Sequence, residues 1–297
     1  MSAREEERIT EVCVFIIGAG PSGLSAAIKL RERGINDLVI VDRAKQVGGT
    51  WAMNDYPGLC CDVPSELYSL GYAPKPDWSR SFAPQAEIRD YLESVAKQFA
   101  LMPLIQLGQE VEGAEWNGSE RCWDITTNQQ RIRARYLIAA PGFIGEPVMP
   151  QFPGQDRYKG TLMHSACWNH QHDFSGERVA VIGSGASAIQ FLPQIQAKVR
   201  QLISFQRTPS WVLPKPDFPM PAAISRLFAR IPASQTLVRQ VALLATEANL
   251  PVFMNEPLLR LISHPLGKFN IYRAVKKPEL RKRLTPEFTL GCKRPLL

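Results

Sequence analysis

The sequence lacks any uncharged apolar run of eighteen residues, so its 45% hydrophobic content does not predict a membrane-spanning helix. It also shows no signal peptide, because its first ten residues, MSAREEERIT, are acidic and lead straight into a strand pattern. Its six cysteines form neither a CxxC pair nor a disulfide framework. The 297 residues therefore predict an ordinary cytoplasmic protein with reduced thiols and room for two domains.

Positive charge is concentrated in the last third of the chain. Residues 200–297 hold 16 Lys and Arg against 5 Asp and Glu, whereas residues 1–199 hold 19 against 23. No nucleic-acid recognition motif accompanies this basic region, so we expect a phosphorylated cofactor and a solvated helical face rather than nucleic acid. No metal site is expected, because His170 and His172 come without the further ligands that a metal needs.

A glycine-rich loop near the start has the features of a dinucleotide-binding site. The stretch VCVFIIGAGPSGLSAAIKL reads as a buried strand, a turn and a helix, with Gly18, Gly20 and Gly23 in the pattern G-x-G-x-x-G. Such a turn brings backbone amides and the positive end of the helix dipole close to a pyrophosphate. The next strand, LVIVD, ends at Asp42, whose carboxylate can accept hydrogen bonds from ribose hydroxyls.

The same pattern returns in RVAVIGSGASAIQ, with alanine at the third glycine position. Its loop positions are Gly183, Gly185, Ser187 and Ala188. The strand that follows, QLISFQ, leads into Arg207 and Thr208. The sequence therefore predicts two nucleotide sites in one chain, the alternative being that one of the loops is a plain structural turn.

The two loops differ in the residue that ends their second strand. Gly18 and Asp42 are 24 positions apart, and so are Gly183 and Arg207. A carboxylate suits a free ribose 2′-hydroxyl, whereas a guanidinium suits a 2′-phosphate. We therefore expect FAD at the first loop and NADP(H) at the second, as in a flavin enzyme that a nicotinamide reduces.

The segment after the first loop argues against one class of flavin enzyme. Disulfide reductases need a redox CxxC pair near the flavin, but Cys60 and Cys61 are adjacent and no other cysteines lie close in sequence. They stand instead within GGTWAMNDYPGLCCD, residues 48–62.

This stretch and a second one resemble the type I Baeyer–Villiger monooxygenases of the flavin-containing monooxygenase superfamily. The first family pattern is [AG]-G-x-W-x4-[FY]-P-[GM]-x3-D, and it is filled by Gly48, Gly49, Trp51, Tyr56, Pro57, Gly58 and Asp62. The second is F-x-G-x3-H-x3-W-[PD], which YKGTLMHSACWN matches at Gly160, His164 and Trp168. Tyr158 and Asn169 depart from it, but Trp168 favours ketone oxidation over the related oxidation of nitrogen or sulfur.

The resemblance implies the roles of further residues. Beyond the two glycine loops, it assigns cofactor contacts to Gly49, Thr50, Trp51, Asp62, Tyr68, Val111, Arg207, Thr208, Lys293 and Arg294. It also implies a small ketone substrate, O2, and ester formation through a C4a-peroxyflavin. Arg294 would stabilise the negative charge as a permanent cation, with Asp62 as the carboxylate that orients it.

The resemblance also implies the fold, namely two Rossmann-like α/β domains. We expect an FAD-binding part over residues 1–145 and an NADP-binding domain over 146–297, with a helical insertion at about 216–288. In the family the chain continues past this arginine, so the sequence is expected to be the front portion of a longer protein. Two alternatives stay open, namely a nitrogen- or sulfur-oxidising flavin monooxygenase and an inactive truncated fragment that binds nucleotide.

Overall fold

The computed structural model describes residues 9–248, 254–290 and 296–297. The chain divides into two compact units, each made of two segments. The first unit consists of Met1–Asp55 and Ala86–Trp168, and the second consists of Tyr56–Gln85 and Asn169–Leu297. This division differs from the expected boundary at residue 145, because residues 146–168 group with the first unit and residues 56–85 with the second. Which domain holds which cofactor stays a prediction.

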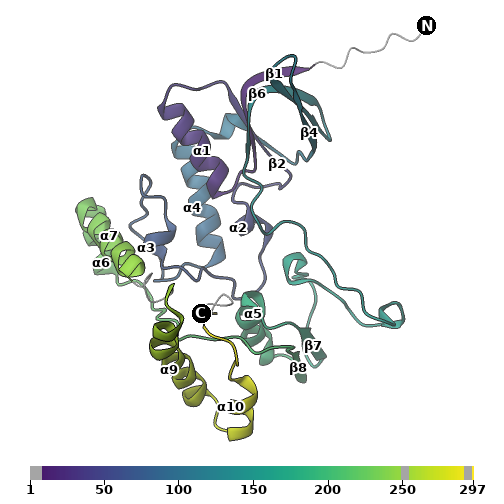
Figure 1. The fold of residues 1–297 in the computed structure, drawn as a ribbon, viewed down its shortest axis with the longest axis vertical. Helices are drawn as coiled ribbons and strands as arrows, with labels where there is room; N and C mark the ends of the chain where they lie inside the picture. The colour runs from purple at the N-terminus through teal and green to yellow at the C-terminus, as the bar shows by residue number, and fades with distance from the viewer. Residues whose placement is uncertain (1–8, 249–253, 291–295) are drawn as a thin grey trace. The chain divides into compact units, whose positions relative to one another are not determined.

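The first unit is built on a six-stranded mixed sheet with the order β3-β2-β1-β6-β5-β4 (Figure 1). Its strands are β1 (Thr10–Ile17), β2 (Leu38–Asp42), β3 (Ile105–Leu107), β4 (Val111–Asn117), β5 (Cys122–Thr127) and β6 (Arg131–Ala139). Strands β3, β2, β1 and β6 are parallel neighbours, and β5 and β4 continue from β6 as an antiparallel meander. The expected strands at residues 12–17 and 38–42 therefore form the centre of the parallel part.

Helices α1 and α4 run next to each other beside this sheet (Figure 1). The helical segments are α1 (Pro21–Glu32), α2 (Thr50–Met53), α4 (Gln85–Gln98), η1 (Met102–Leu104), η2 (Gln155–Arg157) and η3 (Ser165–Cys167). Helix α1 starts with Pro21. Proline lacks a backbone N–H, and it fits the first helical position because an N–H there would have no partner inside the helix. It buries Leu24, Ala27 and Ile28, the apolar side that its 3.6-residue period produces.

Side chains of the sheet strands form much of the hydrophobic core of the first unit. Val14, Phe15 and Ile16 of β1 are all at most 1% exposed, as expected for a parallel strand that is covered on both faces. Phe15 belongs to a cluster with Val41, Ile125, Ile132 and Ala134, which joins the parallel strands to the meander. The ends of β1 and β2 are therefore held firmly, and the first glycine loop and Asp42 follow directly from them.

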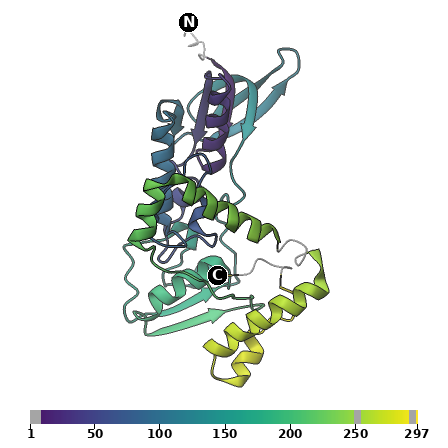
Figure 2. The ribbon, with the colours of Figure 1, turned by 90° about the vertical axis from the view of Figure 1, so that its left-hand side faces the viewer.

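The second unit contains a smaller parallel pair, β7 (Arg178–Ile182) and β8 (Gln201–Phe205), joined by helix α5 (Ala186–Gln196) (Figure 2). Both strands and the intervening helix stand where the second nucleotide motif predicts them. The other helices of this unit are α3 (Ser65–Tyr68), α6 (Ala222–Arg230), α7 (Pro232–Ala248), α9 (Glu256–Ala274) and α10 (Pro278–Leu284). Helices α6, α7, α9 and α10 occupy the region expected as a helical insertion.

Trp211 is the centre of a second small core. Its ring is 1% exposed and packs with Ile271 and Leu290, and its indole N–H donates to the carbonyl oxygen of Phe288 at 2.9 Å. A Cβ at Gly267 would lie 2.5 Å from the Trp211 ring, so α9 approaches the indole through a glycine. The segment that follows β8 is thereby fixed to the helical region.

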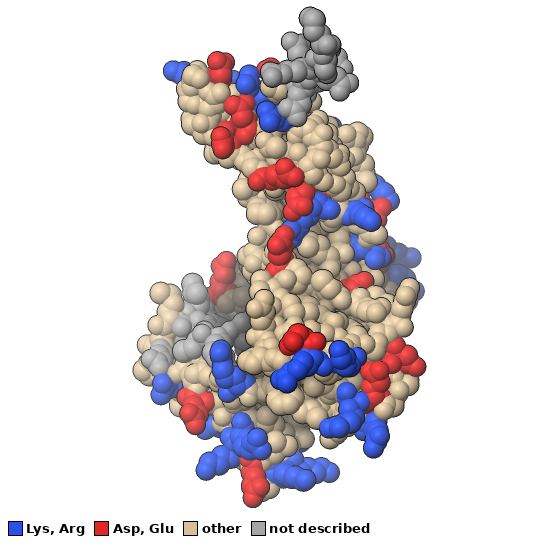
Figure 3. Space-filling view, turned by 90° about the vertical axis from the view of Figure 1, so that its right-hand side faces the viewer, with Lys and Arg blue, Asp and Glu red and all other residues tan. Residues whose placement is uncertain are grey.

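The basic character of the last third is visible on the surface of the second unit, where Lys and Arg side chains gather (Figure 3). The last turn of α10 alone carries Arg281, Lys282 and Arg283. Within the described ranges, no helix combines the length and the apolar character that a membrane crossing requires.

Candidate functional site

The first glycine loop makes a tight turn that only glycine permits at two positions. Gly18 has φ +103°, and a Cβ there would lie 2.3 Å from the carbonyl oxygen of Ala140, just after β6. A Cβ at Gly23 would lie 1.8 Å from the carbonyl oxygen of Gly18. Gly20 is the N-cap of α1, so the free amides at the helix start face the loop. The loop therefore has the form of an anion-binding turn.

Asp42 is the last residue of β2, and its carboxylate also stabilises the glycine turn. Its Oδ2 accepts a hydrogen bond from the amide of Ala19 at 2.7 Å, and its Oδ1 accepts one from the amide of Ala44 at 2.8 Å. Each carboxylate oxygen has a second lone pair, which remains available for a ribose hydroxyl. The structural part of this role was not predicted from the sequence.

A second glycine pair closes against the first loop. Gly49 has φ +56°, and a Cβ there would lie 3.0 Å from the Cα of Gly20. The amide of Gly48 donates to the carbonyl oxygen of Ala19 at 3.1 Å. The start of the Gly48–Asp62 stretch is therefore packed directly on the glycine turn.

These loops line a cavity of about 340 Å³ in the first unit. It brings together six of the predicted cofactor-binding residues, namely Gly18, Gly20, Asp42, Gly49, Thr50 and Val111. Gly23 serves the packing of α1, and Trp51 is 7% exposed in the core; neither lines the cavity. A glycine turn at the start of a helix, with a carboxylate at the end of the next strand, fits the adenosine and pyrophosphate part of a dinucleotide such as FAD.

The rim of this cavity includes charged residues that the sequence analysis missed. Arg43 donates from Nη1 to Glu146 at 2.8 Å and lies 3.7 Å from Glu110. Arg43 follows Asp42 directly, which is a weak local signal, but its partner Glu146 is 103 residues away.

The second loop is more open than the first. Gly183 has φ +121°, and its amide donates to the carbonyl oxygen of Phe205 at 3.0 Å. A Cβ at Gly183 or at Gly185 would meet no atom within 4 Å. Ala188, at the position that matches Gly23, is 6% exposed, so the second loop has room for a methyl group where the first loop has none.

The segment that follows β8 is tied to the second loop. Ser184 Oγ donates to the carbonyl oxygen of Thr208 at 3.3 Å, and Ser210 Oγ donates to the carbonyl oxygen of Ser184 at 3.2 Å. Arg207 is exposed, and Ser187 lies in the first turn of α5. Arg207 and Thr208 therefore stand beside the loop, at the place where a 2′-phosphate is expected.

Asp62 and Tyr68 belong to the second unit, in the segment that contains the adjacent cysteines. Cys61 is 2% exposed, and burial raises the pKa of its thiol to about 11. Tyr56 packs edge-to-face on Phe191 of α5 and donates from its hydroxyl to Gln190 Oε1 at 3.1 Å. This segment is therefore anchored to the helix that starts at the second glycine loop.

The residues of the second family pattern up to Trp168 lie in the first unit, in a loop that contains the short helix η3. His164 caps η3, where its Nδ1 accepts from the amide of Ala166 at 3.1 Å. A Cβ at Gly160 would lie 2.4 Å from the hydroxyl oxygen of Tyr158, so this glycine gives the tyrosine its room. Trp168 follows η3 directly. His164 thus has a structural contact of its own, and its functional role stays a prediction.

Two further expectations concern residues 170–172 and the chain's last residues. His172 Nε2 contacts Glu177 at 3.0 Å, and the described residues contain no group of ligands able to hold a metal ion. Lys293 and Arg294 lie outside the described residues. Their predicted roles therefore rest on the sequence.

The sequence is similar to those of known nucleotide-binding enzymes. The profile of the family described as pyridine nucleotide-disulphide oxidoreductase matches residues 15–219, which include both glycine loops. A Baeyer–Villiger monooxygenase from Streptomyces coelicolor is 43% identical over 294 residues, covering 99% of this chain and 57% of that protein.

Solved structures show the same fold. A steroid monooxygenase bound to NADP has a TM-score of 0.85 and 28% identity, over 97% of this chain and 62% of that one. OTEMO in complex with FAD and NADP has a TM-score of 0.82 and 25% identity, over 98% of this chain and 63% of that one. The α/β fold with Rossmann-like units, which the family resemblance implies, is confirmed.

The chain spans about half the length of the curated relatives it matches, between 50% and 57% for three of them. The cysteine pair of disulfide reductases is missing from the sequence, and the similar proteins are monooxygenases. The chain therefore belongs to the family described as pyridine nucleotide-disulphide oxidoreductase, and the relatives that it resembles at 40–43% identity are Baeyer–Villiger monooxygenases.

Proposed function

We propose that the protein is an NADPH-dependent flavin monooxygenase that inserts one oxygen atom of O2 next to the carbonyl carbon of a ketone, giving an ester or lactone. The observation that carries this proposal is the pair of glycine loops with opposite charges at equal spacing, Asp42 after the first and Arg207 after the second. The similarity to Baeyer–Villiger monooxygenases supports it.

FAD is assigned to the first loop and NADPH to the second. Gly20 and Gly49 would hold the FAD pyrophosphate through their amides, and Asp42 would accept from the ribose. The amide of Gly18 donates to the carbonyl oxygen of Val41 at 2.7 Å, so Gly18 would shape the turn beside the pyrophosphate. Arg207, Thr208 and Lys293 would bind the 2′-phosphate of NADPH, which a cation and a hydroxyl suit. When bound, FAD supplies the two-electron redox chemistry and the reaction with O2.

The remaining chemistry is assigned to two residues of this chain. Arg294 would stabilise negative charge on the carbonyl oxygen of the substrate, because a guanidinium keeps its proton in a dry site. Asp62 would orient that guanidinium as its carboxylate partner. We place the enzyme in the cytoplasm, in line with the free thiols of the five described cysteines.

The test uses the whole protein, incubated with FAD, NADPH, O2 and a panel of cyclic and linear ketones. The proposal predicts NADPH-dependent ester or lactone formation, detected by gas chromatography and mass spectrometry. A methyl aryl sulfide in the same panel tests heteroatom oxidation, which the departures at Tyr158 and Asn169 keep as a second candidate. Sulfoxide formation with no ester from any ketone would replace the first function by the second.

A further inference from the structure

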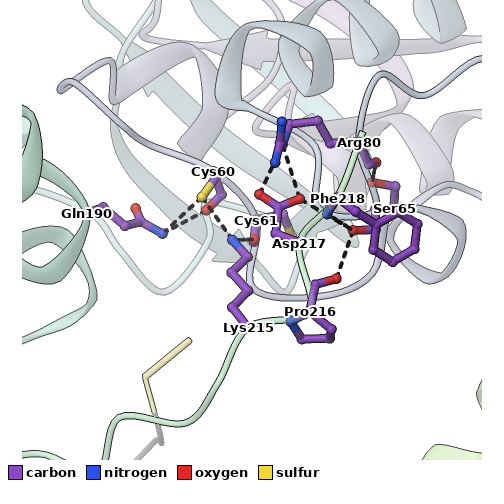
Figure 4. Close-up of polar contacts among 10 residues, drawn as sticks. Cys60, Cys61, Ser65, Arg80, Gln190, Lys215, Pro216, Asp217 and Phe218 are labelled. Carbon is purple, nitrogen blue, oxygen red and sulfur yellow. Dashed lines mark hydrogen bonds and ion pairs between the residues drawn. The ribbon is translucent and has the colours of Figure 1, made fainter. Parts of the chain in front are cut away.

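Two side chains of the second unit, Gln190 in helix α5 and Lys215 in the segment after β8, hold the backbone just before Asp62. Lys215 Nζ donates to the carbonyl oxygen of Cys61 at 2.8 Å, and Gln190 Nε2 donates to the carbonyl oxygen of Cys60 at 3.0 Å. Figure 4 shows both side chains pointing toward this pair of residues from different segments. Successive carbonyl groups immediately before Asp62 are therefore fixed from outside their own segment.

The ammonium group of Lys215 has further contacts that keep it in place. It donates to Cys60 Sγ at 3.0 Å and lies 4.8 Å from the ring centre of Phe82. The segment after it is also pinned, because Arg80 Nε contacts both carboxylate oxygens of Asp217 at 3.1 and 3.0 Å. The segment that carries Lys215 is therefore fixed at two points, by Lys215 itself and by Asp217 two residues later (Figure 4).

Backbone hydrogen bonds reinforce this anchor. Ser81 donates from Oγ to the carbonyl oxygen of Pro216 at 3.0 Å and from its amide to the carbonyl oxygen of Phe218 at 3.0 Å. The amide of Phe218 donates back to Ser81 Oγ at 3.0 Å. The segment 215–218 and residues 80–82 thus form one rigid connection.

Gln190 and Lys215 both lie a few residues after predicted NADPH-binding residues in the sequence. Gln190 lies in α5, whose N-cap is Gly185 of the second loop. Lys215 lies in the segment that begins at Arg207 and Thr208. The elements that are expected to bind the nucleotide are therefore the same elements that position the backbone before Asp62.

We propose that Lys215 and Gln190 are positioning residues for Asp62, tying this carboxylate to the NADPH-binding half of the protein. The inference rests on the proposed function. Neither side chain is assigned a contact with substrate or cofactor, so their effect on the reaction passes through the geometry of Asp62. A displacement of about 1 Å in a catalytic group costs on the order of 100-fold in rate.

The first test compares Lys215→Met with wild type in the whole protein, using ester formation from a ketone that wild type converts. We expect a loss of at least about tenfold in kcat, with KM for NADPH within about twofold, because Lys215 is not expected to touch the phosphate. Lys215→Arg, which can still donate to the Cys61 carbonyl, should recover part of the loss. An unchanged kcat, or a parallel change in kcat and KM, would overturn the proposal.

Lys276→Met is the matched control, because Lys276 is an exposed lysine of the same unit and lies outside the site. It should keep the wild-type kcat. Gln190→Met is a near-isosteric second variant, and it should show the same split between kcat and KM even where Lys215→Met does not fold. A wild-type kcat in folded Gln190→Met would count against the inference.

The second test is a double-mutant cycle with Asp62→Asn. If Lys215 acts through Asp62, adding Lys215→Met to Asp62→Asn should lower kcat by less than about twofold. Multiplying losses would show that Lys215 acts elsewhere, which contradicts the proposal. A wild-type protein that forms no ester would instead refute the proposed function, so the two failures are distinguishable.

Discussion

Gly23→Ala tests how closely helix α1 packs on the first nucleotide loop. The added Cβ would lie 1.8 Å from the carbonyl oxygen of Gly18 and 3.5 Å from Cγ2 of Ile16. The first of these contacts is with backbone, so no side-chain rotation can relieve it. The helix would have to move by more than an ångström, away from the strand on which the loop depends.

The expected cost follows from two opposing terms. Overpacking a well-packed site costs about 1–3 kcal/mol, and a backbone contact this short belongs at the upper end. Alanine is about 1 kcal/mol better than glycine inside a helix, which offsets part of that cost. The net expectation is a loss of about 2 kcal/mol in the free energy of unfolding of the first unit.

Urea unfolding followed by tryptophan fluorescence measures this loss as a shift in midpoint at unchanged m-value. Gly113→Ala in β4 is the control, because a Cβ there meets no atom within 4 Å, and it should change stability by less than about 0.5 kcal/mol. Ala188→Gly, the reverse change at the matching position of the second loop, should cost about 1 kcal/mol. A Gly23→Ala protein as stable as the Gly113→Ala control would refute the close-packing argument.

Three further predictions concern the cofactor and two buried groups. Arg207→Ala should weaken NADPH binding by about 1–3 kcal/mol and leave NADH binding nearly unchanged, as measured by titration calorimetry; equal losses would contradict the 2′-phosphate assignment. Burial raises the pKa of Glu66, so the folded state holds this proton more tightly than the unfolded state. The stability this provides should therefore be lost as pH rises above the ordinary value of 4.5, and Glu66→Gln should flatten the decline; parallel pH profiles would contradict this. Because burial raises the pKa of Cys61 to about 11, iodoacetamide at pH 8 should label exposed Cys167 and spare Cys61 in peptide mass spectra; equal labelling would show that Cys61 is accessible as a thiolate.

The sequence predicted the parts of this fold that leave a local pattern. Strands β1 and β2 are short apolar runs next to glycine turns, and Asp42, predicted from the strand that it ends, lines the cavity. Thr50 and Val111 also line it, but they were expected only from the family resemblance. The equal spacing of the second motif likewise located β7, α5 and β8. Periodicity and turn chemistry are local, so one sequence is enough to read them.

Long-range contacts left no such pattern. Lys215 is 154 residues from Cys61, and Gln190 is 130 residues from Cys60. A lysine after a proline-rich turn and a glutamine inside a helix are ordinary in sequence, and only the fold brings them together. The grouping of residues 56–85 with the second unit depends on the same contacts, so the division of the chain was not predictable.

A crystal structure of the whole protein with FAD and NADP+ tests the central claim most directly. The account predicts the flavin nucleotide at the first loop, with its ribose beside Asp42, and the 2′-phosphate of NADP+ within hydrogen-bond distance of Arg207. FAD bound at the Gly183 loop, or a 2′-phosphate held away from Arg207, would contradict it.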